Sequence, residues 1–494
     1  MKTHRADHVI VGAGIAGIWL ARRLLSMGRS VAMIEIGPHT PDGARPPHPP
    51  LHFPERENLG AVQARHHALT GNSSFWGGAL IRNDAQSLRG MFDLDEREGV
   101  LEEFARSYDA VEQQLDAPSL GRSLLEEAPH PARLAEVNVL PGRQRNLART
   151  VLQSCAGHPG FKLLCPAEVV EFDIGADGRI EAVTALAEDG SPIVLRAAHY
   201  VLSAGVIDSN ILALTKLATA LDGVHDRIGT CLHDHWSIPI ARFRWKRGAG
   251  VEWLYPPTFR KGYIQGRRVE FDVALPRGVH SGFLHVQAQY DLVEPYATIK
   301  KWMNARQEGQ RWWQQARFLL PLIGHSPHMV RIGHSRFIDG RLFVADGMEL
   351  TVVMDFESFP SPLNRLTFEN GEYRLHWDVR EQDVAAFAAL LPRGIDLMMR
   401  WMRESGLDLE LLADSDQLDV QREYIRTHAV DAYHLGGGLA VRRDLERGLL
   451  APDLRFHKIR NLAVISTAAF ARPGIANPVE TLLAMCETYA RNLS

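Results

Sequence analysis

Val9-Ile10-Val11-Gly12-Ala13-Gly14-Ile15-Ala16-Gly17, near the start of this 494-residue chain, predicts a buried parallel strand and a glycine-rich turn into a helix. Gly12 suits a tight bend, Gly14 lets the backbone approach a pyrophosphate, and Gly17 lets helix and strand pack closely. A second strand, 30–35, ends on Glu35, an acid placed to hold ribose hydroxyls. The stretch therefore predicts a Rossmann-type nucleotide site. The competing interpretation is a glycine turn that binds no nucleotide.

The composition excludes several classes of protein. A hydrophobic content of 45% indicates a globular chain with a substantial core, and a net charge of −4 with mixed signs does not favour nucleic acid. No apolar run approaches the roughly 18 to 20 residues of a membrane helix, and no signal-peptide region opens the chain. We expect a cytoplasmic protein with reduced thiols, because no zinc spacing or C-x-x-C pair joins Cys155, Cys165, Cys231 and Cys486.

Further elements follow along the chain. The proline-rich stretch 38–54 predicts a surface loop, and 96–135 has the periodicity of a solvent-facing helix. A second glycine and serine cluster, 70–78, can bring backbone amides against a ring or a phosphate, although a plain loop would read the same way. Strands at 167–174, 180–183 and 198–205 form a predicted meander, and a helix is expected from Val206.

Two C-terminal segments carry the predicted chemistry. His434 precedes Leu435-Gly436-Gly437-Gly438, and Asn477 lies in Pro473-Gly474-Ile475-Ala476-Asn477-Pro478. A histidine that titrates near neutrality is a natural proton acceptor for an alcohol, and a nearby amide can hold the same oxygen. The alternative is a histidine whose hydrogen bonds are satisfied in the core.

In their order, these motifs resemble the glucose-methanol-choline (GMC) flavoprotein oxidoreductases over almost the whole chain. The segments 231–235 and 364–367 belong to the same pattern. The branch that looks most similar is that of the pyranose oxidases, because Asn477 stands where many members have a second histidine. The resemblance implies an α/β fold: a Rossmann-like FAD-binding domain with an inserted α+β substrate domain of antiparallel sheet and helices. It places the FAD-binding domain at 1–235, with lid or loop insertions at about 38–150, and at 431–494, and the substrate domain at 236–430.

The resemblance also implies a site. The expected catalytic residues are His434 and Asn477. The expected FAD-binding residues are Gly12, Gly14, Gly17, Glu35, Gly71, Asn72, Ser73, Ser74, Trp76, Val169, Ala204, Ser466 and Pro478. Non-covalent FAD is expected, because Phe75 stands where some pyranose oxidases carry a flavin-linking histidine. Ser466 lies where most members have an aspartate, and the residues after His434 depart from the family pattern.

The function that the resemblance implies is oxidation of a CH–OH group on a sugar, glycoside or aminosugar-containing metabolite. Hydride would pass to FAD, His434 would act as general base, and oxygen or another acceptor would reoxidise the flavin. The alternatives are a bulky apolar alcohol such as a sterol, an FAD-containing lyase, or an NAD-dependent dehydrogenase or nucleotide-binding regulator that uses only the first motif.

No metal is expected at His233-Asp234-His235. The tryptophans of 236–430 are interpreted as core more readily than as sugar platforms. The stretch 299–322 is interpreted as a packing helix, with a membrane-surface helix as the alternative.

Overall fold

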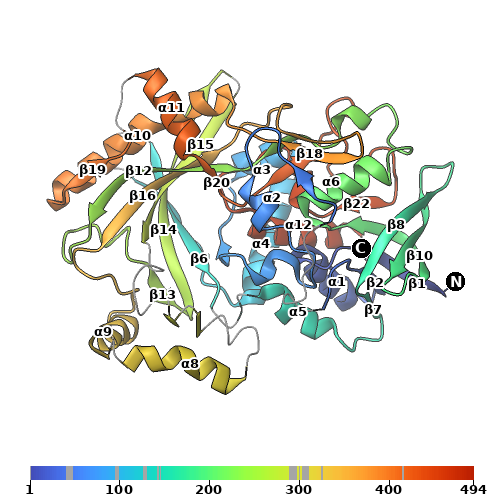
Figure 1. Cartoon of the computed structure of the whole chain (residues 1–494), viewed down its shortest axis with the longest axis horizontal. Coiled ribbons are helices and arrows are strands. Elements are labelled where there is room, and N and C mark those ends of the chain that lie inside the picture. The colour runs from blue at the N-terminus through green and yellow to red at the C-terminus, as the bar shows by residue number, and fades with distance from the viewer. Residues whose placement is uncertain are drawn as a thin grey trace.

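The computed structural model describes residues 2–39, 48–94, 99–125, 131–141, 144, 146–276, 278–288, 298–299, 301–302, 311–323, 326–413 and 417–493. Two large sheets lie side by side, one built mostly from the N-terminal part and one mostly from the middle of the chain (Figure 1). The α/β class predicted from the sequence is confirmed.

The first sheet has seven strands and contains the predicted nucleotide-binding strand. Its parallel part runs in the order β7-β2-β1-β10-β22, and an antiparallel meander of β9 and β8 extends it. The bounds are β1 Lys2–Val11, β2 Val31–Ile34, β7 Phe161–Leu164, β8 Ala167–Ile174, β9 Ile180–Ala187, β10 Pro192–Leu202 and β22 Leu462–Val464. The carboxyl ends of β1, β2 and β10 meet at one edge, which is where ligands bind in such sheets.

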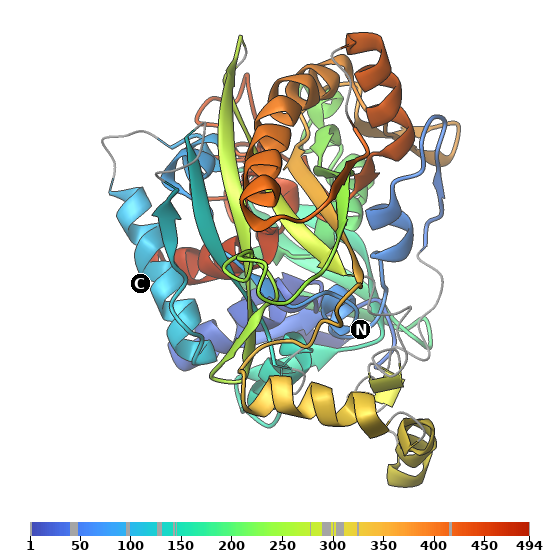
Figure 2. The same cartoon turned by 90° about the vertical axis from the view of Figure 1, so that its left-hand side faces the viewer.

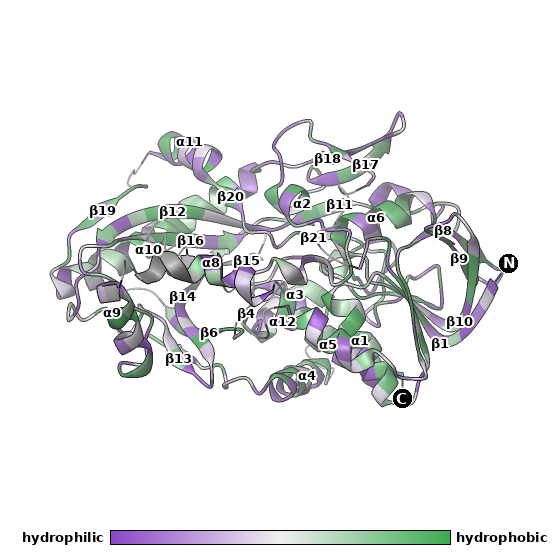
Figure 3. Cartoon of the chain, turned by 60° about the horizontal axis from the view of Figure 1, so that its bottom comes forward, coloured by the Kyte–Doolittle hydropathy of each residue, from purple (hydrophilic) through white to green (hydrophobic). Residues whose placement is uncertain are grey.

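The glycine turn after β1 leads into helix α1, Ile15–Ser26, as predicted. Gly12 has φ +101°, and a Cβ there would lie 2.4 Å from the carbonyl oxygen of Ser203. A Cβ at Gly17 would lie 2.2 Å from the carbonyl oxygen of Gly12. Only glycine allows these approaches, so both positions are fixed by backbone packing. Figure 3 shows the mixed hydrophobic and hydrophilic faces of α1 and of α5, Leu147–Cys155.

The second sheet has ten strands, and its pairings are antiparallel. The main order is β19-β12-β16-β15-β14-β6-β4, with β13, β20 and β5 on its margins. The bounds are β4 Ala79–Leu80, β5 Arg122–Leu124, β6 Ala132–Val139, β12 His235–Arg244, β13 Thr258–Arg260, β14 Tyr263–Leu275, β15 Gly278–Ala288, β16 Glu349–Glu357, β19 Leu409–Leu411 and β20 Val430–Asp431. Strands β4, β5 and β6 precede residue 150, so this sheet also draws on the predicted insertions. The domain boundaries stay a prediction.

Helix α10, Glu381–Ser405, covers one face of the ten-stranded sheet, and α11, Leu418–His428, lies beside it (Figure 2). A Cβ at Gly394 of α10 would lie 3.5 Å from side-chain atoms of Ile240 and Leu284, so the helix packs closely on this face. Strand alternation turns Ser237 and Asp355 to the opposite face, toward the seven-stranded sheet.

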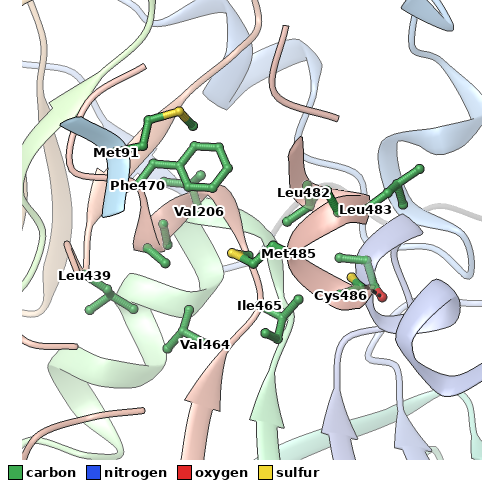
Figure 4. Packing of buried hydrophobic residues seen from close by; sticks show 14 of the residues in the cluster. Met91, Val206, Leu439, Val464, Ile465, Phe470, Leu482, Leu483, Met485 and Cys486 are labelled. Atoms are coloured by element: carbon green, nitrogen blue, oxygen red, sulfur yellow. Dashed lines mark hydrogen bonds between the residues drawn. The ribbon is translucent and has the colours of Figure 1, made fainter. Parts of the chain in front are cut away.

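The remaining elements connect and cover these sheets. The helices are α2 Leu59–Gln63, α3 Ala85–Phe92, α4 Val100–Leu115, α6 Gly205–Thr215, α8 Trp312–Ile323, α9 Ser326–Phe337 and α12 Pro478–Arg491, with short 3₁₀ turns at Gly71–Ser74, His225–Arg227 and Thr467–Ala469. Strand β11, Thr230–His233, pairs with β21, Gly436–Gly438, and β3 Leu51–His52, β17 Arg365–Glu369 and β18 Glu372–His376 form a small sheet. The buried side chains Leu482, Leu483, Met485 and Cys486 of α12 belong to one hydrophobic cluster with Met91, Val206, Ile465 and Phe470 (Figure 4).

Several sequence predictions need adjustment. The predicted helix over 96–135 is confined to α4, because β5 and the start of β6 occupy its second half. The predicted loop 38–54 contains β3, and 40–47 lie outside the described residues.

Trp236, Trp245 and Trp377 are core residues, as preferred. In the predicted helix 299–322, residues 300 and 303–310 are outside the description, and Trp312 is 75% exposed on α8. The four cysteines are free thiols, and none of the described helices is long and apolar enough to cross a membrane.

Candidate active site

A cavity of about 1420 Å³ lies where the carboxyl ends of the parallel strands of the seven-stranded sheet face the ten-stranded sheet. Typical small-molecule pockets measure about 300 to 1,000 Å³, so this one has room for a large cofactor together with a substrate. Nearly all the predicted site residues line it: Gly12, Gly14, Glu35, Gly71, Asn72, Ser73, Trp76, Val169, Ala204, His434, Ser466, Asn477 and Pro478. Gly17 does not, because it packs against Gly12 instead, and the side chain of Ser74 lies outside the description.

The glycine turn offers a cradle at the start of α1. Gly14 is the N-cap residue of this helix with φ −78°, and a Cβ added there would meet nothing within 4 Å. The first amides of a helix have no partners within the helix, and the helix dipole favours negative charge at this end. Gly71 abuts the turn, since its added Cβ would lie 3.4 Å from the Cα of Gly14. These residues fit the pyrophosphate of a dinucleotide such as FAD.

Glu35 holds the cradle as well as lining it. One of its carboxylate oxygens accepts the amide N–H of Ala13 at 2.8 Å, and the other accepts the amide N–H of Gly37 at 2.8 Å. Burial raises the pKa of Glu35, and these two hydrogen bonds oppose that rise. Each carboxylate oxygen retains a second acceptor site, which fits the predicted ribose contact.

His434 and Asn477, 43 residues apart in sequence, meet in the cavity. The side-chain amide nitrogen of Asn477 lies 3.0 Å from Nε2 of His434. Asn477 occupies the N-cap position of α12, where an asparagine commonly accepts a backbone N–H, but it makes no such bond. Pro478 begins the helix. The side-chain amide of Asn477 therefore contacts His434 and faces the cavity.

The glycines after His434 explain its placement. Gly437 and Gly438 have φ of +89° and +92°, and they form β21 against β11. A Cβ at Gly437 would lie 2.5 Å from the carbonyl oxygen of Cys231, and one at Gly438 would lie 2.2 Å from the side chain of Asn210. The triple glycine thus lets this segment lie close enough to β11 and α6 for His434 to reach the cavity.

A relay of hydrogen bonds sets the tautomer of His434. Nε2 of His235 lies 2.7 Å from the carbonyl oxygen of Gly474, which can only accept, so His235 carries its proton on Nε2. Its Nδ1 is then an acceptor, and it lies 3.3 Å from Nδ1 of His434. His434 must therefore donate from Nδ1, which leaves Nε2 unprotonated, with its lone pair accepting the side-chain N–H of Asn477.

Asp234 anchors the two histidines through their backbones. Its carboxylate accepts the amide N–H of His235 at 2.6 Å and that of His434 at 3.0 Å. Burial, followed by the Asp431 carboxylate, raises the pKa of Asp234. Asp234, His235 and His434 also each present one possible metal ligand within 4.8 Å of one another. The expectation that no metal binds here stays a prediction.

Both histidines are neutral in this setting. Burial, followed by the neighbouring His235, lowers the pKa of His434 to about 3. Burial likewise lowers the pKa of His235 to about 4. A neutral His434 with its lone pair on Nε2 can accept a proton from a ligand in the cavity.

Comparison with known proteins decides the family of the C-terminal part. Residues 364–486 match the sequence model of the GMC oxidoreductase family. This part of the chain is a GMC oxidoreductase domain. It contains both His434 and Asn477, and it confirms the resemblance and indicates an FAD-dependent oxidoreductase. A comparison with curated proteins gave no match.

Solved structures of similar fold cover almost the whole chain. A formate oxidase from Aspergillus oryzae RIB40, studied for FAD modification, is 16% identical with a TM-score of 0.57 over 99% of this chain and 98% of its own. Pyridoxine 4-oxidase from Mesorbium loti is 15% identical with a TM-score of 0.58 over 98% of each chain. At this identity the similarity shows a common fold.

Sequence reasoning missed the relay. The sequence places His235 in the family-like segment 231–235 and in a triplet where no metal is expected, but it assigns His235 no role, and His235 lies 199 residues from His434. The alternation of His233, Asp234 and His235 across a short strand break was the only local signal, and it does not reveal which side chain reaches the site.

Proposed function

We propose that this protein oxidises a CH–OH group of a polar alcohol, of the sugar, glycoside or aminosugar class, with His434 as the base. The observation that carries the proposal is the unprotonated Nε2 of His434 in the cavity, 3.0 Å from the side-chain amide nitrogen of Asn477. When bound, FAD supplies the hydride acceptor. Polar side chains of Ser237, Gln287 and Asp355 line the same cavity, which favours a polar substrate over a sterol.

In this proposal, His434 takes the hydroxyl proton on Nε2 and then carries it as an imidazolium. Asn477 donates an N–H to the alcohol oxygen and fixes its direction toward the histidine. His235 keeps the proton of neutral His434 on Nδ1. The Asp234 carboxylate holds the two backbones together, so the two rings keep their relative position.

The cofactor contacts proposed for this chain follow the cavity lining. The glycine turn with Gly14 and the start of α1 would hold the pyrophosphate, and Glu35 the ribose. The cluster from Gly71 to Trp76, together with Val169, Ala204, Ser466 and Pro478, would contact the rest of FAD. Oxygen or another acceptor would then reoxidise it.

FAD is expected to be bound without a covalent link. Phe75, which stands where some pyranose oxidases carry the flavin-linking histidine, lines the cavity and is 57% exposed. Its ring centroid lies 4.0 Å from that of His66. Acid precipitation of the purified protein should leave the yellow colour in the supernatant. Colour in the pellet would identify another attachment residue, and peptide mapping of the neighbouring His66 would be the first check.

Asn477→Ala should slow flavin reduction without loss of FAD, because it removes a donor to the alcohol oxygen but no cofactor anchor. Asn477 and His434 act on one oxygen, so the double variant should lose less than the product of the two single losses. Stopped-flow flavin reduction is measured for the wild type, the two single variants and the double variant. Fully multiplicative losses would show that the two side chains act independently.

His235→Leu should slow flavin reduction by roughly 10- to 100-fold, the size typical of losing a partner that orients a functional histidine. His235→Gln should restore most of the rate, since its amide can donate to Gly474 and accept from His434. Metal content is measured in parallel, because a bound ion would also be lost in both variants. Equal rates for the two variants would contradict the relay.

The experiment that tests the function is a screen for anaerobic flavin bleaching across sugars, glycosides, sterols and simple alcohols. Bleaching by a polar alcohol is the expected result. Turnover of a cyanohydrin without bleaching would indicate a lyase. A colourless protein that binds NAD would indicate a nucleotide-binding protein of another kind.

A further inference from the structure

One wall of the cavity near His434 is formed by the ten-stranded sheet. Ser237 of β12 pairs with Asp355 of β16, and Gln287 of β15 lies on the same wall. The neighbouring residues Met354 and Phe356 alternate to the opposite face, where α10 packs. The sheet therefore presents a row of polar groups, one of them a carboxylate, to the substrate space.

Asp355 is 7% exposed, and its Oδ1 has no hydrogen-bond partner. Its Oδ2 lies 3.3 Å from Nε2 of His285. Among the ion pairs of the described residues, Asp355 has no lysine or arginine partner. Burial alone would raise the pKa of Asp355, but His285, then a contact with Ser237, lower it overall. Oδ1 of this ionised carboxylate is a buried acceptor in the cavity wall that a cationic group of a ligand can fill.

The charged residues that line the cavity also favour a cationic ligand. Its lining contains five acidic residues, Glu35, Glu168, Asp208, Asp355 and Asp431, but two permanent cations, Arg65 and Lys216. Arg65 is already paired with Asp208 at 2.5 Å. Arg268, on the same sheet face as Asp355, is paired with Glu270 at 2.6 Å. The excess of negative charge attracts cations into the cavity.

We propose that Asp355 binds a protonated amino group of the substrate, so that the enzyme acts on amine-bearing alcohols such as aminosugars. The proposal rests on the proposed alcohol oxidation. The carboxylate accepts a charge-assisted hydrogen bond from the ammonium group and places the substrate hydroxyl between His434 and Asn477. A neutral sugar could donate a hydroxyl to Asp355, but it would leave the negative charge of the cavity uncompensated.

The test compares charged amines with their neutral N-acetylated partners on the FAD-loaded enzyme. Glucosamine is paired with N-acetylglucosamine, and 2-aminocyclohexanol with its N-acetyl derivative. Second-order rates of anaerobic flavin reduction and calorimetric dissociation constants are measured for each pair. The amine should be favoured by about 10- to 100-fold, the size of a hydrogen bond to a charged group. Asp355→Asn should abolish the preference, because it should slow the amines much more than their acetylated partners, whereas Asp355→Glu should keep part of the preference.

Asp419→Asn is the matched control, because it removes the same charge from a side chain that is 93% exposed on α11. It should keep the full preference. If no amine is favoured over its acetylated partner, or if the preference survives in Asp355→Asn, the proposal is overturned. Bleaching by neutral alcohols in that case would leave the proposed alcohol oxidation intact, whereas no bleaching by any alcohol would overturn both.

Discussion

His434→Ala is expected to slow flavin reduction by about 10²- to 10⁴-fold, the range for losing a general base, while flavin content stays near that of the wild type. The lone pair on Nε2 is lost, and no other neutral imidazole is positioned beside Asn477 among the described residues. The measurement is anaerobic stopped-flow reduction with a substrate from the screen, together with the FAD content of each preparation.

The matched control is His457→Ala, which removes a half-buried histidine that bonds the carbonyl of Arg442 away from the cavity lining. It should reduce its flavin as fast as the wild type. If His434→Ala does so too, the base lies elsewhere in the cavity.

The pH dependence follows from the lowered pKa of His434. Since that pKa is about 3, the histidine is neutral and able to accept a proton at any pH well above 3. An ordinary histidine pKa, near neutrality, would make the rate of reduction rise with pH through that region. The structure moves that rise into the acid range, so the rate of reduction should be flat from about pH 5 to 8. A step near pH 6.5, the ordinary histidine value, would contradict this placement.

Gly14→Ala is expected to give a folded protein that has lost most of its FAD. The added Cβ meets no protein atom within 4 Å, so the apo fold is not disturbed. It extends into the cavity at the start of α1, where we assign the pyrophosphate. FAD affinity should fall at least about ten-fold, equivalent to 1.4 kcal/mol. Flavin content and the thermal unfolding midpoint of the apo protein are the two measurements.

Gly17→Ala is the contrasting variant. Its Cβ would lie 2.2 Å from the carbonyl oxygen of Gly12. The substitution should therefore lower the thermal stability and the yield of the protein, even without FAD. If Gly14→Ala instead unfolds, or binds FAD as tightly as the wild type, the assigned pyrophosphate position is wrong.

Local sequence patterns predicted the elements whose causes are local. The strand β1, the glycine turn and α1 depend on β-branched residues and on backbone contacts that only glycine allows. His434 and Asn477 were predicted as a pair through the resemblance, and the cavity brings them together.

The parts that could not be predicted depend on contacts between distant segments. The pairing of β5 and the start of β6 within the ten-stranded sheet leaves no strand signal in the charged, helix-like stretch 96–135. The role of His235 requires the Gly474 carbonyl, 239 residues away. Glu35 was predicted as a ribose ligand, but its bonds to Ala13 and Gly37 appear only once the loops are in place.

The most direct test of the central claim is anaerobic flavin reduction in the wild-type holoenzyme by a substrate deuterated at its carbinol carbon. If the C–H bond is broken as hydride passes to FAD, deuterium should slow the reduction severalfold, and the same substrate lacking the hydroxyl should not bleach the flavin. Equal rates for the two isotopologues when bond breaking limits reduction, or bleaching by the compound without the hydroxyl, would contradict alcohol oxidation by this protein.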